Sequence, residues 1–341
     1  MSEGKIRVAV GGQGRSGYDI HCKALRTETD RFDIVAVADQ LPERREDAKV
    51  DFGAEIYDDW RTLLDAGGFD LFINALPSPL HVDASIEALN KGFHVVSEKP
   101  MARTVADFDC IVAAAKENDS KLLPFQNKRL QPYFDKIQEI IASGVLGKIV
   151  HIRSSSSGFK RRWDWQTRQD LSAGNLLNTG PHPVDQALCL FGWDRTPEVF
   201  CRMACENPFE GDAENHVTVT LYDPERVAPQ IDIDVSSLIT FTNPDDYSIS
   251  GTCGGLTGGP KGLKWRYFDP IWLRSKTGGS GRLIDPTSKR ILTGLKRAGR
   301  LMTNPKGSGP GPTDSTTTCS KCCRTAPSHS SRRNSRASRS L

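Results

Sequence analysis

The chain has 341 residues, of which 26% are charged and 37% hydrophobic, and its formal net charge at neutral pH is +3. This length suffices for two domains with sizeable cores, and so small a charge argues against a nucleic-acid partner. No apolar run approaches the roughly 20 residues that cross a bilayer, and "MSEGKIRVAV" lacks the pattern of a secretory signal. Six of the nine cysteines stand singly, like free thiols of a reducing compartment. We therefore expect a soluble, cytoplasmic protein without a membrane segment.

Short apolar runs alternate with segments of helical periodicity over residues 1–126. The expected strands are "KIRVAV", "FDIVAVAD", "LFINAL", "FHVVSEK" and "KLLPFQ". Each is nearly continuous in apolar residues, as strands covered on both faces are. The segments with helical spacing between them include "DDWRTLLDAG", "PLHVDASIEALNKG" and "TVADFDCIVAAAKEND". This alternation predicts a doubly wound parallel sheet with right-handed crossovers, a Rossmann-type nucleotide-binding domain.

A glycine-rich turn, Gly12-x-Gly14-x-x-Gly17, follows the first expected strand and opens a helical segment. In a dinucleotide-binding unit the first glycine makes the tight turn, the second lets the pyrophosphate approach the backbone, and the third lets helix and strand pack closely. The phosphates then lie on unpaired N–H groups at the helix N-terminus. The predicted phosphate-binding residues are Gly12, Gln13, Gly14, Arg15, Ser16 and Gly17.

Asp39 ends the second expected strand, roughly 20 residues beyond the glycines, where an acidic residue binds the ribose. A carboxylate there accepts the ribose hydroxyls and repels a 2′-phosphate, which favours NAD. Arg44 and Arg45 leave NADP open, because an arginine nearby is what NADP sites use. The alternative for both arginines is a solvated helix start.

The pattern changes after Gln126. A helical segment, "PYFDKIQEIIASGVLG", is followed by runs that alternate apolar and polar residues, such as Ile231, Ile233 and Val235. Period two is typical of an open antiparallel sheet with one buried face. Residues 127–270 are therefore expected to form a second, α+β domain.

Two segments, "HVDASIEALNKGFHVVSEKPMA" and "GNLLNTGPHPVDQALCLFG", resemble the glucose–fructose oxidoreductase/inositol dehydrogenase/MocA (Gfo/Idh/MocA) family. The resemblance covers roughly residues 5–269. It implies a Rossmann domain and an α/β substrate domain with the nucleotide in the cleft between them. It also implies that the open sheet mediates oligomers, here a homodimer or homotetramer. Lys99 would reach the substrate, the Lys99–Pro100 peptide is often cis in the family, and His182 would be the catalytic histidine. The carboxylate that the family places four residues earlier maps onto Asn178, so the chain departs from the pattern there.

Oxidation of a secondary alcohol requires a base for the hydroxyl proton. A histidine titrates near neutrality and suits this task, while an ammonium can hold the substrate oxygen. Lys99 and His182 are therefore the predicted catalytic pair, and both would contact substrate. Asn178 either binds a substrate hydroxyl while His182 works with Lys99, or makes the reaction slow or different. Asp185, one turn after His182, is expected to orient the imidazole or to bind substrate.

Four further residues are predicted at the nucleotide: Pro77, His81, Glu98 and Asn127. The resemblance places His81 in the nucleotide pocket, although a first-turn polar residue of a helix is the simpler reading. Glu98 is alternatively a structural partner. Asn127 follows the last expected strand and is a candidate nicotinamide contact.

The loop "SGFKRRWDWQTRQD" combines basic residues with two tryptophans. Trp163 and Trp165 suit a sugar or another polyol, and Arg162 suits a carboxylate or phosphate. Packing of the tryptophans at a subunit contact is an equal alternative. This loop is the predicted specificity element.

Residues 271–341 turn to Gly, Ser, Thr, Arg and Pro, and so little apolar surface predicts disorder. Cys319, Cys322, Cys323 and His329 lack the second half of a zinc site, so no metal is predicted. A third hypothesis is translation in a shifted frame, since "DSTTTCSKCC" can be reread as "LYDNLFEVL", an amphipathic helix start. Sequencing the coding DNA tests that hypothesis.

The leading interpretation is an NAD(P)-dependent dehydrogenase that acts on a hydroxyl of a sugar, inositol or similar polyol. Two alternatives stay open. One is a redox-neutral lyase or glycosidase that uses transient oxidation, and the other is a nucleotide-binding sensor or a catalytically impaired member. Net formation of NADH with candidate polyols distinguishes them.

Overall fold

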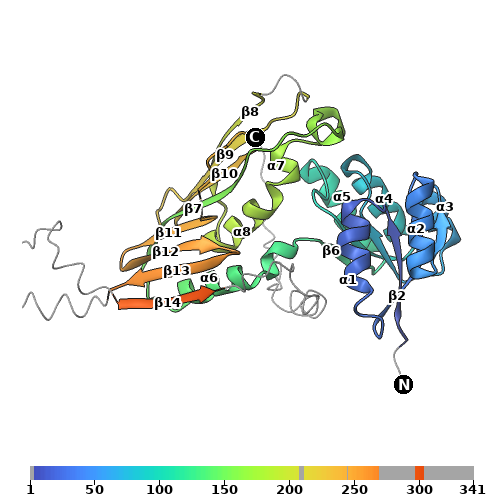
Figure 1. The fold of residues 1–341 in the computed structure, drawn as a ribbon, viewed down its shortest axis with the longest axis horizontal. Coiled ribbons are helices and arrows are strands. Elements are labelled where there is room, and N and C mark those ends of the chain that lie inside the picture. Colours follow the sequence, from blue (N-terminus) through green and yellow to red (C-terminus); the bar gives the residue numbers. More distant parts are fainter. Residues whose placement is uncertain (1–3, 207–210, 244, 269–295, 303–341) are drawn as a thin grey trace, which may run out of the picture. The chain divides into compact units, whose positions relative to one another are not determined.

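The computed structural model describes residues 4–206, 211–243 and 245–268, together with the backbone of 296–302 (Figure 1). These residues form two sheets, one six-stranded and one eight-stranded. The predicted pairing of a parallel Rossmann sheet with a largely antiparallel second sheet is confirmed. The hypotheses on residues 271–341, including Cys319, Cys322, Cys323 and His329, lie outside the described residues except for the backbone of one strand.

The first sheet has the order β3-β2-β1-β4-β5-β6, and every pair in it is parallel. Its strands are β1 (Ile6–Gly11), β2 (Phe32–Ala38), β3 (Glu55–Tyr57), β4 (Leu71–Asn74), β5 (His94–Ser97) and β6 (Leu122–Pro124). Five of the six match the expected apolar runs. β3 was not expected, because it is a three-residue edge strand with no fully buried residue and therefore no apolar run.

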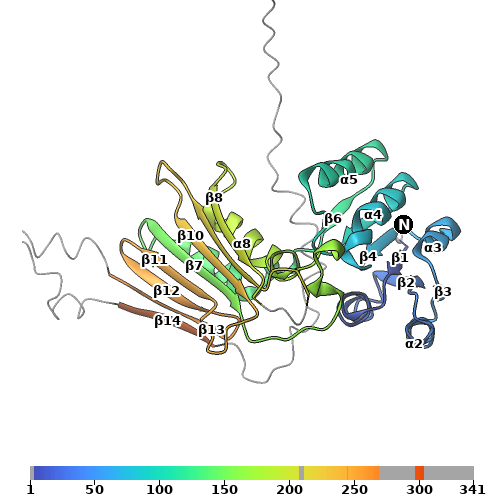
Figure 2. The same cartoon turned by 90° about the horizontal axis from the view of Figure 1, so that it is seen from above.

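Helices cover both faces of this sheet, and Figure 2 shows α4 and α5 on one side of it and α2 on the other. They are the π-helix η1 (Arg15–Cys22), α1 (Lys23–Leu25), α2 (Pro42–Phe52), α3 (Trp60–Ala66), the 3₁₀ turn η2 (Ser78–Leu80), α4 (His81–Asn90) and α5 (Val105–Glu117). Alternate residues of β1 enter different cores. Val8 and Val10 pack with Leu25, whereas Ala9 packs with Phe72 and Leu89. Both faces are thus buried, which explains the continuous apolar runs.

The second sheet has the order β14-β13-β12-β11-β7-β10-β9-β8. Its strands are β7 (Ile149–Ser157), β8 (Glu198–Ala204), β9 (His216–Tyr222), β10 (Gln230–Ser236), β11 (Tyr247–Gly251), β12 (Gly254–Gly259), β13 (Gly262–Tyr267) and β14 (Lys296–Met302). Only β7 and β10 pair in parallel; the other pairs are antiparallel.

Two helices, α6 (Pro132–Ala142) and α8 (Pro181–Phe191), pack on one face of this sheet through Ile137 and Phe191. The opposite face carries polar pairs, such as His151 with Asp232 at 2.7 Å. Short segments connect these elements: the 3₁₀ turns η3 (Asn127–Leu130), η4 (Trp165–Thr167) and η5 (Gln169–Leu171), and the helix α7 (Asn175–Asn178). Within the described ranges, no helix has both the length and the apolarity to cross a bilayer.

Candidate active site

The three motif glycines of the β1–η1 turn differ in what surrounds them. Gly12 has φ +89°, and a Cβ on it would lie 2.4 Å from the Ala75 carbonyl oxygen. A Cβ on Gly17 would lie 1.7 Å from the Gly12 carbonyl oxygen. At Gly14, by contrast, the nearest atom is Arg44 Nη1 at 3.8 Å. Gly12 and Gly17 are therefore needed for the turn itself, whereas Gly14 leaves its outer side open.

The carboxylate of Asp39 lies beside this turn. Its Oδ2 accepts from the Gln13 backbone N–H at 2.7 Å, and its Oδ1 accepts from the Leu41 N–H at 2.9 Å. Arg44 Nη1 lies 3.5 Å from Oδ2, whereas Arg45 donates to the main-chain carbonyl of Asp39. Arg44 is thus the arginine that faces both the acidic residue and the open side of Gly14.

Glu98 follows β5 and is only 5% exposed. Its Oε1 lies 3.2 Å from Nε2 of His21, and its Oε2 accepts from the Lys99 N–H at 3.2 Å. Burial works to raise the pKa of Glu98, but the hydrogen bond and charge of His21 and the charge of Lys99 outweigh it and lower the pKa. His21 also packs against Phe125, with ring centroids 4.2 Å apart. The first helix after the glycines is therefore tied to the residue that precedes Lys99.

His21 was missed from the sequence. The available signal was its position four residues after Gly17, which places both on one face of the helix.

Three side chains predicted at the nucleotide, those of Gln13, His81 and Glu98, are buried and have hydrogen-bond partners within the chain. Gln13 is 4% exposed and its amide faces the Cys22 sulfur. His81 is 2% exposed, and its ring nitrogens lie 2.7 Å from the Pro100 carbonyl and 2.8 Å from the Leu76 carbonyl. Burial lowers the pKa of His81 against the opposing effect of these carbonyls. Both ring nitrogens of His81 thus have main-chain partners, and Glu98 has His21 and Lys99. Nucleotide contacts of these side chains stay predictions.

Two other predicted nucleotide contacts lie at turns that follow strands. Pro77 is exposed and immediately precedes η2. Asn127 is half-buried and begins η3, directly beyond β6. Both therefore lie beyond the carboxyl ends of strands, where ligands of doubly wound sheets bind.

Lys99 meets the second domain at α7. Its ammonium donates to the main-chain carbonyl of Asn178 at 2.8 Å, and the Asn178 side-chain oxygen is 3.5 Å away. Burial lowers the pKa of Lys99, while the charge of Glu98 opposes the shift. The Lys99–Pro100 peptide is cis, as the resemblance implies. The structure thus brings together Lys99 and Asn178, two residues predicted from motifs far apart in the chain.

His182 lies in the first turn of α8 and is held by Gln126. Nδ1 of His182 is 3.1 Å from Oε1 of Gln126, whose amide group donates to the Pro181 carbonyl at 3.5 Å. Because an amide oxygen only accepts, Nδ1 carries the proton and Nε2 keeps its lone pair. Burial, reinforced by the charges of Lys128 and Lys99, lowers the pKa of His182 to about 4. The imidazole is therefore neutral near pH 7 and able to accept a proton.

Asp185 does not orient that imidazole. Both of its carboxylate oxygens accept from Arg129, at 2.6 and 2.8 Å. Of the two roles expected for Asp185, orientation of His182 is not observed, because a bidentate guanidinium holds the carboxylate and Gln126 holds the ring. Substrate binding by Asp185 stays a prediction. Neither Arg129 nor Gln126 was singled out from the sequence.

The predicted specificity loop is only partly anchored. Trp163 is 78% exposed, whereas Trp165 begins η4 and is half-buried. Arg162 forms an ion pair with Asp164 at 2.6 Å, so its charge already has a partner. Among the residues described, no cluster of His, Cys, Asp or Glu side chains could hold a metal ion.

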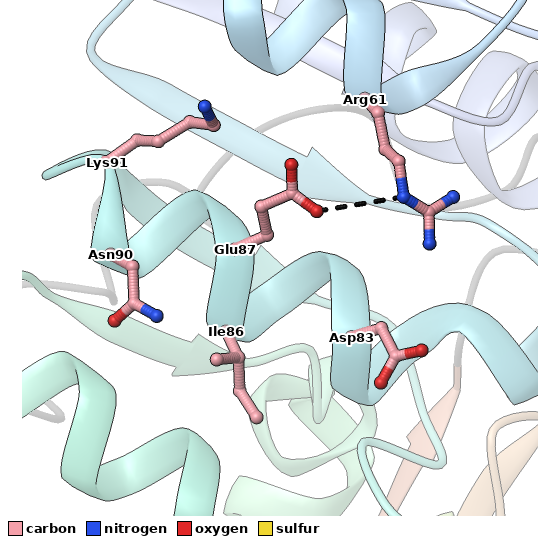
Figure 3. Close-up of a pocket in the computed structure, with 6 residues that line it drawn as sticks. All are labelled: Arg61, Asp83, Ile86, Glu87, Asn90 and Lys91. Carbon is pink, nitrogen blue, oxygen red and sulfur yellow. Dashed lines mark ion pairs between the residues drawn. The ribbon is translucent and has the colours of Figure 1, made fainter.

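A surface hollow elsewhere in the Rossmann domain belongs to α3 and α4 and contains none of the predicted site residues (Figure 3). It is lined by Arg61, Asp83, Ile86, Glu87, Asn90 and Lys91. Arg61 pairs with Glu87 at 3.8 Å, and Lys91 pairs with Asp65 at 2.7 Å. Such exposed pairs contribute little free energy, and we assign the hollow no role.

Comparison with known proteins agrees with this architecture. Residues 6–125 match the family described as "Oxidoreductase family, NAD-binding Rossmann fold", and residues 134–257 match the "GFO/IDH/MocA C-terminal domain". The scyllo-inositol 2-dehydrogenase (NADP(+)) IolW of Bacillus subtilis is 30% identical over 190 residues, which are 55% of this chain and 52% of that protein. The scyllo-inositol 2-dehydrogenase (NAD(+)) of the same organism is 25% identical over 260 residues, 74% of each chain.

Among solved structures, the WlbA dehydrogenase from Bordetella pertussis, in complex with NADH and UDP-GlcNAcA, superposes with a TM-score of 0.70. It is 26% identical, and the match covers 79% of each chain. The chain spans about half the length of the first curated relatives that it matches.

Proposed function

Because the chain belongs to the Gfo/Idh/MocA family of NAD-binding Rossmann oxidoreductases, we propose that it is an NAD(P)-dependent dehydrogenase. In this proposal it transfers a hydride between a hydroxyl-bearing carbon of a sugar or polyol and the nicotinamide. The observation that carries the proposal is the hydrogen bond from the Lys99 ammonium to Asn178. Asn178 lies four residues before His182, whose imidazole is neutral and whose Nε2 can accept a proton.

The glycine turn fits a dinucleotide. The N-terminus of η1 has no side-chain cap, so the first N–H groups of this helix are available to a phosphate. Of the three motif glycines, only Gly14 has free space where a side chain would lie, and the nearest atom there belongs to Arg44. Gly12, Gly14 and Gly17, with the backbone of Arg15 and Ser16, would hold the pyrophosphate.

The choice of nucleotide depends on Asp39 and Arg44. The Asp39 carboxylate would accept the ribose hydroxyls of NAD, and the Arg44 guanidinium would pair with the 2′-phosphate of NADP. Because Arg44 Nη1 lies 3.5 Å from Asp39 Oδ2, a residue that can bind NAD and one that can bind NADP lie at the same place. Of the two Bacillus relatives, one is named for NADP and the other for NAD.

When bound, the nicotinamide supplies the hydride acceptor or donor at its ring. Lys99 would donate a hydrogen bond to the substrate oxygen and stabilise negative charge on it as its proton leaves. His182 would take that proton at Nε2, while Gln126 keeps Nδ1 protonated and the ring in place. Asn178 would offer its side-chain amide to a neighbouring hydroxyl.

The proposed substrate class, a sugar or polyol, is supported by two relatives and by one tryptophan. The two Bacillus relatives are named for inositol, and the half-buried Trp165 offers an apolar platform of the kind that sugars use. A homo-oligomer formed through the polar face of the second sheet and a cytoplasmic location stay predictions.

The experiment that tests the nucleotide site is Gly14→Ala. Its new Cβ meets only Arg44, and Gly14 has φ −74°, so the variant should unfold at the same temperature as the wild type. We expect its affinity for NADH to fall by about tenfold or more, because the methyl group occupies the side from which the pyrophosphate approaches. Fluorescence titration with NADH and NADPH measures this.

The matched control is Gly4→Ala, which has no neighbour within 4 Å of the added Cβ. Equal nucleotide affinity in Gly14→Ala and Gly4→Ala would contradict the placement of the pyrophosphate. Failure of the wild type to retain either nucleotide would overturn the proposal. Nucleotide binding with no net NADH from any polyol would instead favour a sensor or a redox-neutral enzyme.

A further inference from the structure

Lys128 is a half-buried lysine in η3, directly after the last Rossmann strand. Its ammonium makes no hydrogen bond or ion pair with any residue that the structure describes. Three other lysines of the described chain do have carboxylate partners: Lys23 with Asp19, Lys91 with Asp65 and Lys136 with Glu139. Withdrawing an ammonium from water without a partner is costly. Lys128 therefore lacks the anion that would compensate its burial.

The main chain at Lys128 is rigidly held. Its carbonyl accepts from Nε2 of Gln186 at 2.7 Å. Oε1 of Gln186 in turn accepts from the Tyr247 hydroxyl at 2.8 Å, and both of these side chains are at most 3% exposed. Locked supporting residues of this kind are what a precise binding site requires.

Lys128 lies next to the proposed catalytic groups along the chain: Gln126, two residues before it, contacts the His182 ring at 3.1 Å, and Gln186, one turn after His182, donates to the Lys128 carbonyl. The charge of Lys128 acts on the His182 imidazole and on Lys99. The carboxylate that acts on Lys128 itself is Asp246, but the two are not within ion-pair distance, and Lys160 adds a second positive charge. The surroundings of His182 thus hold more positive than negative charge. Arg162, the anion-binding residue expected from the sequence, already has Asp164.

We propose that Lys128 binds an oxyanion of the substrate, so that the preferred substrate is a sugar bearing a carboxylate or a phosphate rather than a neutral polyol. The inference rests on the proposed function, which it narrows to one substrate class. A charge-assisted hydrogen bond in a partly desolvated site is strong enough to discriminate between an anion and a neutral hydroxyl.

The experiment compares three matched sugars, namely glucose, glucuronate and glucose 6-phosphate, with NAD and NADP in parallel. In the wild type we expect the better of the two anions to exceed glucose in kcat/KM by about tenfold or more. In Lys128→Gln the ratio of anion to glucose should fall by about 10- to 100-fold, mainly through KM. The control Lys136→Gln removes another half-buried lysine, on α6, whose ammonium already pairs with Glu139 at 2.6 Å, and it should keep the wild-type ratio.

Equal losses for glucose and the anions in Lys128→Gln would show a merely structural lysine and overturn the inference, as would preference of the wild type for glucose. The two anion arms distinguish a carboxylate from a phosphate. Calorimetric titration of NAD-saturated protein with both anions decides the question independently of turnover. Anion binding that is lost in Lys128→Gln supports the inference even if no oxidation occurs, whereas no anion binding to the wild type overturns it.

Discussion

In the nucleotide half of the candidate site, Asp39 accepts from two backbone amides and Glu98 accepts from Lys99 and contacts His21. In the substrate half, by contrast, the ammonium of Lys128 and Nε2 of His182 have no hydrogen-bond partner among the described residues. The carboxylates of the first half are held by the chain itself, so their positions are set before any ligand arrives. The second half has polar groups without a partner in the described chain. A substrate can bind to them, so we expect substrate selectivity to depend on this half.

The largest expected effect is a loss of stability when the His21–Glu98 contact of the nucleotide half is removed. In His21→Leu the buried Glu98 carboxylate loses the side chain that contacts Oε1 and keeps only the Lys99 N–H on Oε2. Removing the side-chain partner of a buried charge costs about 3 to 5 kcal/mol of unfolding free energy. Urea unfolding followed by circular dichroism measures this. The double variant His21→Leu/Glu98→Gln should recover part of the loss, because no unpaired charge stays buried. A single variant as stable as the wild type would contradict the structural role of the pair.

The next effect comes from Lys99, which joins the two halves. Lys99→Met keeps the apolar stem but removes the ammonium, and we expect kcat to fall by about a hundred- to thousandfold. Affinity for NADH should stay within about twofold, because the glycine turn supplies the pyrophosphate contacts. Steady-state kinetics and nucleotide titration check the two parts separately. Undiminished turnover would remove Lys99 from the chemistry.

The smallest effect is a displacement of the pH profile. Because burial and two lysines lower the pKa of His182 to about 4, the base stays neutral from pH 7 down to about pH 5. The rate constant kcat/KM should therefore fall only as the pH drops through about 4, not near the ordinary value of 6.5. Circular dichroism at each pH controls for unfolding. An acidic limb near 6.5 would show a solvated histidine and contradict the described burial.

The same comparison explains what could be predicted from the sequence. The glycine turn, Asp39 and the segment ending in Lys99 are local patterns, so their elements were predictable. The contacts that complete the site join residues far apart: His21 with Glu98 across 77 positions, Gln186 with Lys128 across 58, and Arg129 with Asp185 across 56. No local pattern encodes such pairs, because they depend on how separate elements pack. The pairing of Asp185 with Arg129 was missed for this reason.

The contact between Lys99 and Asn178 has a consequence for how this site can diverge. The shorter of the two distances is to the main-chain carbonyl, not to the side chain. Any residue at position 178 offers that carbonyl, so the anchor of the lysine survives replacement of the asparagine. Position 178 is thereby released to adapt to a particular substrate while Lys99 and His182 stay where they are.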